Sequence, residues 1–176
     1  LETPASAHRQ RSRPMARARI GVSMGEILFL CHRIPWPADR GDNIRSHWML
    51  RRLVSIAPVH VGSFAEDARD AGFVADMAAL AKTHHIAMRT KPNWRAGLEA
   101  LATRVPVSVA AFHDAELAAW VRATLAAHPI DSIVVFSGQM AQYIPADFAA
   151  NPAKRVIMDF VDVDSAKFES YAASGN

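Results

Sequence analysis

Residues 27–31 of the chain are Ile-Leu-Phe-Leu-Cys, a run of apolar side chains with no polar interruption. A strand buried on both faces has this continuous pattern, whereas a strand with one face in water alternates apolar and polar residues. Residues 133–136, Ile-Val-Val-Phe, repeat the pattern. The sequence therefore predicts buried strands, which we place at residues 27–31, 59–64, 85–88, 132–136 and 155–161.

Helical patterns separate these strands. Residues 43–56 carry apolar side chains at helical spacing behind Asp42 or Asn43 as the cap, and residues 73–81 and 115–127 are also predicted to be helical. Another helix starts at Asn93. Strands that alternate with helices predict a Rossmann-like, doubly wound parallel sheet in a single domain. The helical spacing of Trp48, Trp94 and Trp120 predicts core positions for them, and Trp36 is predicted to line the crevice.

The composition sets the class of protein. The chain has 176 residues, of which 51% are apolar and 21% are charged, enough for one ordinary hydrophobic core. Cys31 is the one cysteine, which excludes an internal disulfide and favours a reducing, cytoplasmic location. No apolar run reaches the ~20 residues of a membrane-spanning helix, and the N-terminal residues lack the apolar core of a secretory signal.

The positive charge is concentrated at the N-terminus. The formal net charge is +3, and residues 1–23 contain five arginines and one acidic residue, Glu2. We predict that residues 1–23 are a basic, disordered flank and that the domain spans residues 24–176, with Met24 as the candidate natural start. A basic flank is weak evidence for a nucleic-acid surface, so no nucleic-acid partner is predicted. Because the helical pattern after Asp162 stops abruptly, we expect the domain to be truncated at its C-terminus.

Polar residues follow the predicted strands where a parallel sheet binds its ligands, at the carboxyl ends of the strands. A glycine before a helix lets backbone amides approach an anion, and arginines neutralise phosphates. Two alternatives remain for these positions. Gly41 is an ordinary loop glycine, or the aspartates after residue 161, Asp162 and Asp164, cap the next helix. The candidate substrate- or phosphate-binding residues are Arg40, Gly41, Asp42, Arg45, Ser137, Gln139, Asp162 and Asp164.

Several common chemistries lack their sequence signals. The fingerprint G-x-G-x-x-G and the phosphate-binding loop G-x-x-x-x-G-K-[ST] are absent, which argues against a standard NAD enzyme or an NTPase. Cys31 and His32 are adjacent on a strand and so point to opposite faces, which makes Cys31 a structural residue. Ser137 lacks the G-x-S-x-G elbow of a hydrolase. No metal is predicted, because zinc-site spacing is missing among His60, His84, His85, His113 and His128.

Two blocks of sequence resemble a known enzyme family. Residues 27–37, Ile-Leu-Phe-Leu-Cys-His-Arg-Ile-Pro-Trp-Pro, continue into Arg-Gly-Asp-Asn-Ile-Arg-Ser at 40–46, and residues 158–165 are Met-Asp-Phe-Val-Asp-Val-Asp-Ser, followed by Lys167 and Tyr171. The first block resembles the start of the group 1 (family four) glycosyltransferases, and the second is similar to a later segment of them. The resemblance is strongest to the sugar transferases that accompany bacterial exopolysaccharide and exosortase loci.

The resemblance implies a GT-B architecture, in which two Rossmann-like domains face each other across a cleft. This chain would be the N-terminal, acceptor-side half of a retaining, metal-independent hexosyltransferase in exopolysaccharide or related glycoconjugate synthesis. The loop at Arg40, Gly41 and Asp42 would approach the acceptor and the donor phosphates. The nucleotide-sugar is a substrate, no cofactor is implied, and a lipid-linked acceptor leaves open a peripheral contact with the inner membrane.

The chain departs from the family pattern in its glutamates. The donor domain of the family carries two glutamates eight positions apart, and no such pair occurs here among Glu2, Glu26, Glu66, Glu99, Glu116 and Glu169. We therefore predict that the donor domain is missing, that the isolated chain is inactive, and that its catalytic residue is unassigned. The alternative is a stand-alone, non-catalytic Rossmann-like module that binds a nucleotide or a sugar phosphate.

Overall fold

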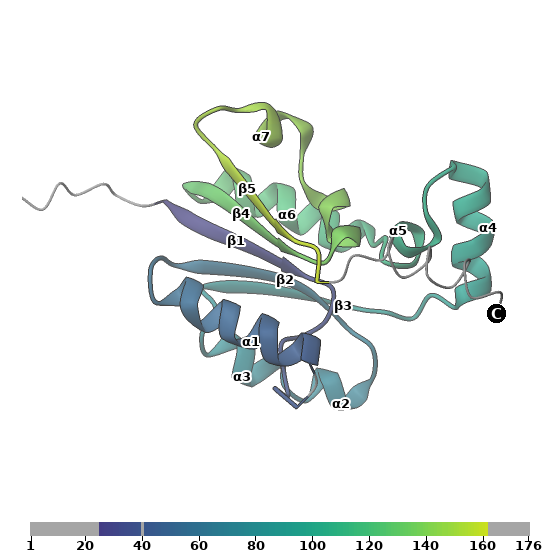
Figure 1. Cartoon of the computed structure of the whole chain (residues 1–176), viewed down its shortest axis with the longest axis horizontal. Helices are drawn as coiled ribbons and strands as arrows, with labels where there is room; N and C mark the ends of the chain where they lie inside the picture. The colour runs from purple at the N-terminus through teal and green to yellow at the C-terminus, as the bar shows by residue number, and fades with distance from the viewer. Residues whose placement is uncertain (1–24, 40, 162–176) are drawn as a thin grey trace, which may run out of the picture.

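The computed structural model describes residues 25–39 and 41–161 (Figure 1). They form a five-stranded sheet in the order β3-β2-β1-β4-β5, and every neighbouring pair is parallel. Helices lie against both faces, which confirms the predicted Rossmann-like α/β fold. The strands are β1 (Glu26–Cys31), β2 (Val59–Ala65), β3 (Thr83–Met88), β4 (Ile130–Phe136) and β5 (Arg155–Asp159).

The central strand β1 is buried on both faces, as its continuous apolar sequence predicts. Leu28 and Leu30 point into one core cluster, together with Ile133 of β4. Phe29 lies in the cluster on the opposite face, with Val134 of β4. Successive side chains of a strand point to opposite faces of a sheet, so an uninterrupted apolar run supplies both cores at once.

Helices α1 (Gly41–Val54) and α3 (Val74–Ala78) cover one face of the sheet, where they bury Leu50 and Met77. The other face is covered by α6 (Ala115–Ala127), the 3₁₀ helix η1 (Gly138–Tyr143) and α7 (Ala146–Ala150). Figure 1 shows α1 and α3 together on one side of the strands. None of the helices in the described part of the chain combines the length and apolarity needed to span a bilayer.

Helix α4 (Asn93–Thr103) packs on α5 (Val107–Ala111) beyond the end of the sheet (Figure 1). The contact between them is made by Ala96, Ala100 and Ala110. The large apolar side chains therefore point outward, and Trp94 is 63% exposed. The predicted core position of Trp94 is wrong, because the small residues of α4 form its buried stripe.

The other tryptophans differ from one another. Trp48 is 60% exposed on α1, so its predicted core position is also wrong. Trp120 of α6 packs against the core as predicted, and its ring stacks on His85 at 5.9 Å. Trp36 packs against the core on the α1 face and contacts the His47 ring edge-on at 4.4 Å.

Two predicted helices differ in their boundaries. Helix α1 begins at Gly41, so Asp42 and Asn43 lie inside its first turn and do not cap it. The helix predicted at residues 73–81 is present as the shorter α3, and a separate short helix, α2 (Ala68–Ala71), precedes it. Strand β5 ends at Asp159, short of the predicted 161, where Val161 has a left-handed φ of 64°.

Candidate functional site

The candidate site lies at the carboxyl ends of β1 and β4, where the strand order of the sheet reverses. From β1 the chain continues through α1 to β2 on one side, whereas β4 lies on the other side of β1. Helices that leave neighbouring strands toward opposite faces open a crevice at this point, and ligands of doubly wound sheets bind there. His32 follows β1, Ser137 follows β4, and α1 starts at Gly41.

His32 packs against two aromatic rings just after β1. Its ring stacks on Phe136 at 5.8 Å with an interplanar angle of 11°, and it contacts Phe112 edge-on at 6.1 Å. Its Nε2 lies 3.5 Å from Oδ2 of Asp42. Burial lowers the pKa of His32 below its usual value, and the negative charge of Asp42 opposes that shift. A neutral imidazole can both donate and accept a hydrogen bond, so His32 is suited to a hydroxylated ligand.

Arg45 and Asp159 join the first turns of α1 to the end of β5. The guanidinium Nη2 of Arg45 lies 2.8 Å from Oδ2 of Asp159. The Arg45 side chain is 56% exposed and the Asp159 side chain 13%, so the carboxylate is fixed while much of the guanidinium faces solvent. Asp159 also accepts a hydrogen bond from the Val161 amide at 3.0 Å. The arginine can therefore receive a second anion without losing its position.

Ser137 has an unusual backbone conformation at the end of β4. Its φ is 83° and its ψ 130°, a combination that costs a residue with a Cβ about 1–3 kcal/mol. The Ser137 amide donates to the carbonyl of Asp159 at 2.8 Å, and its hydroxyl donates to Oε1 of Gln139 at 2.6 Å. Strained residues concentrate at ligand sites, so Ser137 supports a functional role for this edge.

We predict that Ser137→Gly raises the free energy of unfolding by about 1 kcal/mol, because glycine adopts this φ without a steric cost. Chemical denaturation measures the change. The control is Ser132→Gly on β4, where positive φ is absent. There glycine adds flexibility to the unfolded chain and removes the hydrogen bond of the hydroxyl to Asp131, so a loss is expected. A loss of stability in Ser137→Gly as large as in the control would contradict the strain.

The predicted site residues are brought together only in part. Asp42 contacts His32, Arg45 contacts Asp159, and Ser137 contacts Gln139. A Cβ on Gly41 would meet nothing within 4 Å, so the protein leaves open space at the start of α1. Arg40, Asp162 and Asp164 lie outside the described residues.

A second polar group at the same edge was not among the predicted site residues. Glu66, which follows β2, accepts hydrogen bonds from Arg33 and, at 2.7 Å, from Arg89. The Arg33 hydrogen bond is the main reason why the pKa of Glu66 lies below its usual value. Glu66 and Arg89 come directly after strands, and Arg33 is the second residue after β1. Polar residues after predicted strands were therefore the signal for this group and for His32.

Cys31 is fully buried, and burial raises the pKa of its thiol to about 12. A thiol with this pKa stays protonated at neutral pH and is a poor nucleophile, which agrees with the predicted structural role.

Comparison of the chain with protein-family models, curated proteins and solved structures gave no match.

Proposed function

We propose that the chain is the acceptor-side half of a nucleotide-sugar-dependent glycosyltransferase. The proposal depends most on the contact between Arg45 and Asp159, whose side chains lie 2.8 Å apart. Arg45 belongs to the first of the two sequence blocks that resemble this enzyme family, and Asp159 belongs to the second. Blocks that are distant in the sequence and resemble the same family thus meet at the carboxyl ends of the strands, which supports the proposal.

The side chains at this edge suit a sugar and a phosphate. Carboxylates such as Asp42 accept hydrogen bonds from sugar hydroxyls, and His32 supplies a neutral donor and acceptor. Arg45 carries a partly exposed positive charge, which favours a diphosphate. The amides of the first turn of α1, a helix of 14 residues, add donors for an anion. In the proposed reaction these groups orient the acceptor and stabilise the leaving diphosphate.

The exposed face of α4 favours a lipid-linked acceptor. Trp94, Leu98 and Leu101 are 63%, 61% and 80% exposed, and Arg95 lies over the Trp94 ring at 5.3 Å. Tryptophan and arginine side chains with this arrangement suit a membrane interface. A contact of α4 with the inner membrane would bring the site close to such an acceptor. The second candidate, a non-catalytic module that binds a sugar phosphate, needs only the same side chains at the carboxyl ends of the strands.

The first test is the mass of the gene product in its source cells, measured by immunoblot with an antibody against this chain. The transferase proposal predicts a band at roughly twice the 19.3 kDa of the chain, since a donor domain has a similar size. The full-length product should then transfer radiolabelled sugar from UDP-glucose, UDP-galactose or GDP-mannose into a lipid extract. A band at the mass of the chain itself would favour the binding module.

In the full-length enzyme we expect Asp42→Ala to lower kcat/KM for transfer at least tenfold, or about 1.4 kcal/mol. The substitution removes the carboxylate beside His32 and leaves the core untouched. The control is Asp76→Ala, which removes an exposed carboxylate from the first turn of α3 and should leave the rate unchanged. Circular dichroism checks that both variants are folded. An unchanged rate in Asp42→Ala would contradict the assignment of this edge.

A further inference from the structure

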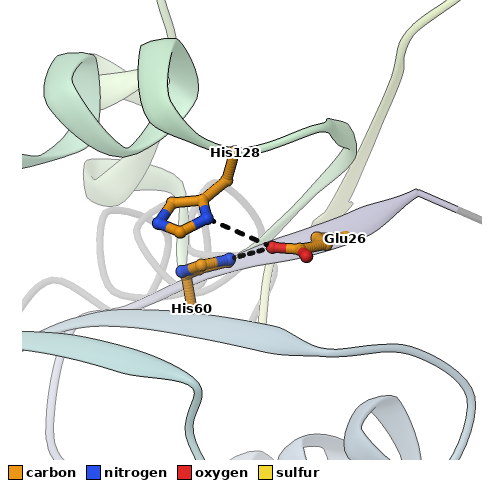
Figure 2. Close-up of side chains that lie close together, drawn as sticks. All are labelled: Glu26, His60 and His128. Atoms are coloured by element: carbon orange, nitrogen blue, oxygen red, sulfur yellow. Dashed lines mark hydrogen bonds and ion pairs between the residues drawn. The ribbon is translucent and has the colours of Figure 1, made fainter.

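A carboxylate and two imidazoles form a cluster at the amino ends of the strands, opposite the candidate site. Glu26 starts β1, His60 lies on β2, and His128 follows the last turn of α6. Nε2 of His60 is 2.7 Å from Oε2 of Glu26, and Nδ1 of His128 is 3.5 Å from the same oxygen. Figure 2 shows both rings pointing their nitrogen atoms at this carboxylate. The His60 side chain is fully buried.

We propose that Glu26, His60 and His128 bind a divalent transition metal ion, with Zn²⁺ as the best fit. Two imidazole nitrogens and one carboxylate oxygen are a common ligand set for zinc, which keeps a water molecule as the fourth ligand. The potential ligand atoms all lie within 4.8 Å of one another. Tetrahedral zinc needs its ligands about 3.3 Å apart, so small side-chain movements from 2.7 and 3.5 Å make room for the ion.

Thr83 holds the His60 ring in the orientation that a metal requires. Its hydroxyl lies 2.7 Å from Nδ1 of His60. Without metal, Nε2 donates its proton to Glu26, and the threonine hydroxyl donates to Nδ1. With metal on Nε2, the ring proton is on Nδ1 and the threonine oxygen accepts it, because a hydroxyl can donate or accept. The buried ring is satisfied in both states, and the second nitrogen of a metal-bound histidine usually has such a partner.

Lys82 competes with the metal for Glu26. Its ammonium group contacts Oε1 of Glu26 at 2.5 Å, and its positive charge lowers the affinity of the cluster for a cation. The Lys82 side chain is 42% exposed, so the ammonium group can move into water when the ion arrives. The His128 side chain is 26% exposed, which gives the ion a path from solvent.

The cluster lies at the amino ends of the strands, away from the proposed sugar site. A bound ion would connect β1, β2 and the segment between α6 and β4. We therefore assign the metal a structural role, independent of the proposed glycosyl transfer, which is metal-independent. A failure of one proposal leaves the other unaffected, because the two are measured with different ligands.

The test is calorimetric titration of the purified, EDTA-treated chain with ZnCl₂. One equivalent should bind to the unmodified chain, and His128→Ala should weaken this binding at least tenfold. His128 is the ligand to replace, since it is partly exposed and its loss spares the core, whereas removal of buried His60 endangers folding. His84→Ala is the matched control, because His84 is exposed on β3 and outside the cluster. It should bind zinc like the unmodified chain.

Two further measurements complete the test. Lys82→Met removes the competing charge and should tighten zinc binding. The melting temperature of the unmodified chain should increase with zinc concentration, as for any ligand that binds only the folded state, and that of His128→Ala should not. Absence of saturable zinc binding to the unmodified chain, or equal affinities for it and His128→Ala, would overturn the proposal.

Discussion

Phe136→Ala should lower the free energy of unfolding by about 3–5 kcal/mol, the cost of removing a buried aromatic ring and leaving a cavity. Phe136 is 1% exposed at the end of β4 and packs into the core on the α1 face. Since a domain of this size is stable by about 5–15 kcal/mol, the substitution removes a large part of its stability. The ring is also the surface on which His32 stacks, so the core and the candidate site depend on the same side chain.

Urea denaturation of the unmodified chain and of Phe136→Ala measures this loss of stability, and Phe160→Ala is the control. Phe160 is 65% exposed just after β5, so its loss should cost less than about 1 kcal/mol.

In Phe136→Leu, which keeps most of the buried volume and should fold, more water reaches the His32 ring. Because burial is the main reason for the lowered pKa of His32, its NMR titration should move toward higher pH. An equal loss of stability in both alanine variants would contradict this picture of the core.

Tyr143→Phe should have the second-largest effect, a loss of about 1–3 kcal/mol. The buried Tyr143 hydroxyl donates a hydrogen bond to the carbonyl of Phe112 and accepts one from the amide of Asp114 at 2.9 Å. Phenylalanine keeps the ring and leaves the Asp114 amide without its partner. Asp114 caps α6, since its side chain accepts from the Leu117 amide at 2.7 Å, so the start of that helix should loosen.

Hydrogen exchange of the amides in the first turn of α6 gives a local measurement of that loosening. Gln142→Ala provides the comparison, because the Gln142 side chain donates to the same Phe112 carbonyl at 3.2 Å. When either the Tyr143 hydroxyl or the Gln142 amide is present, the Phe112 carbonyl keeps a hydrogen-bond donor. When both are removed, it loses these two donors. The double variant should therefore lose more stability than the sum of the single variants. Strictly additive losses would show that the two donors do not share this acceptor.

The sheet was predictable because its signal is local. An uninterrupted apolar run such as residues 27–31 can only be buried on both faces, and the strands at β1, β2 and β4 follow the predicted positions closely. Helix α6 has the predicted bounds, Ala115–Ala127. Its first residue follows Asp114, which caps it, and an aspartate at that position is a strong start signal.

The exposed tryptophans were not predictable from spacing. Trp94, Leu98 and Leu101 repeat at helical intervals, and that pattern usually marks a buried face. Helix α4 instead packs through Ala96 and Ala100 on α5, because small residues allow two short helices to approach closely. Periodicity shows that residues share a face and does not show which face is covered.

The edge that holds the candidate site was predictable, but the pairs of residues within it were not. Each candidate residue follows a predicted strand, which is a local property of the sequence. That Asp159 contacts Arg45 depends on β5 lying next to β4 and on β4 lying next to β1, an order that no local pattern specifies. The same holds for Glu26, His60 and His128, which are distant along the chain and meet only through the strand order.

The strand order also determines when the molecule can fold during synthesis. Of the five strands of the described sheet, β1 is translated first, and one of its two neighbours, β4, ends at Phe136. At about 5–20 residues per second, the ribosome needs about 5–20 s to extend the chain from Cys31 to Phe136. During that time β1 has no β4 to pair with, so the hydrogen-bonding groups on one side of this apolar strand stay unpaired. Non-local pairing of this kind slows folding. The nascent chain is therefore most prone to misassociation before β4 emerges, so chaperone capture should be strongest in that interval.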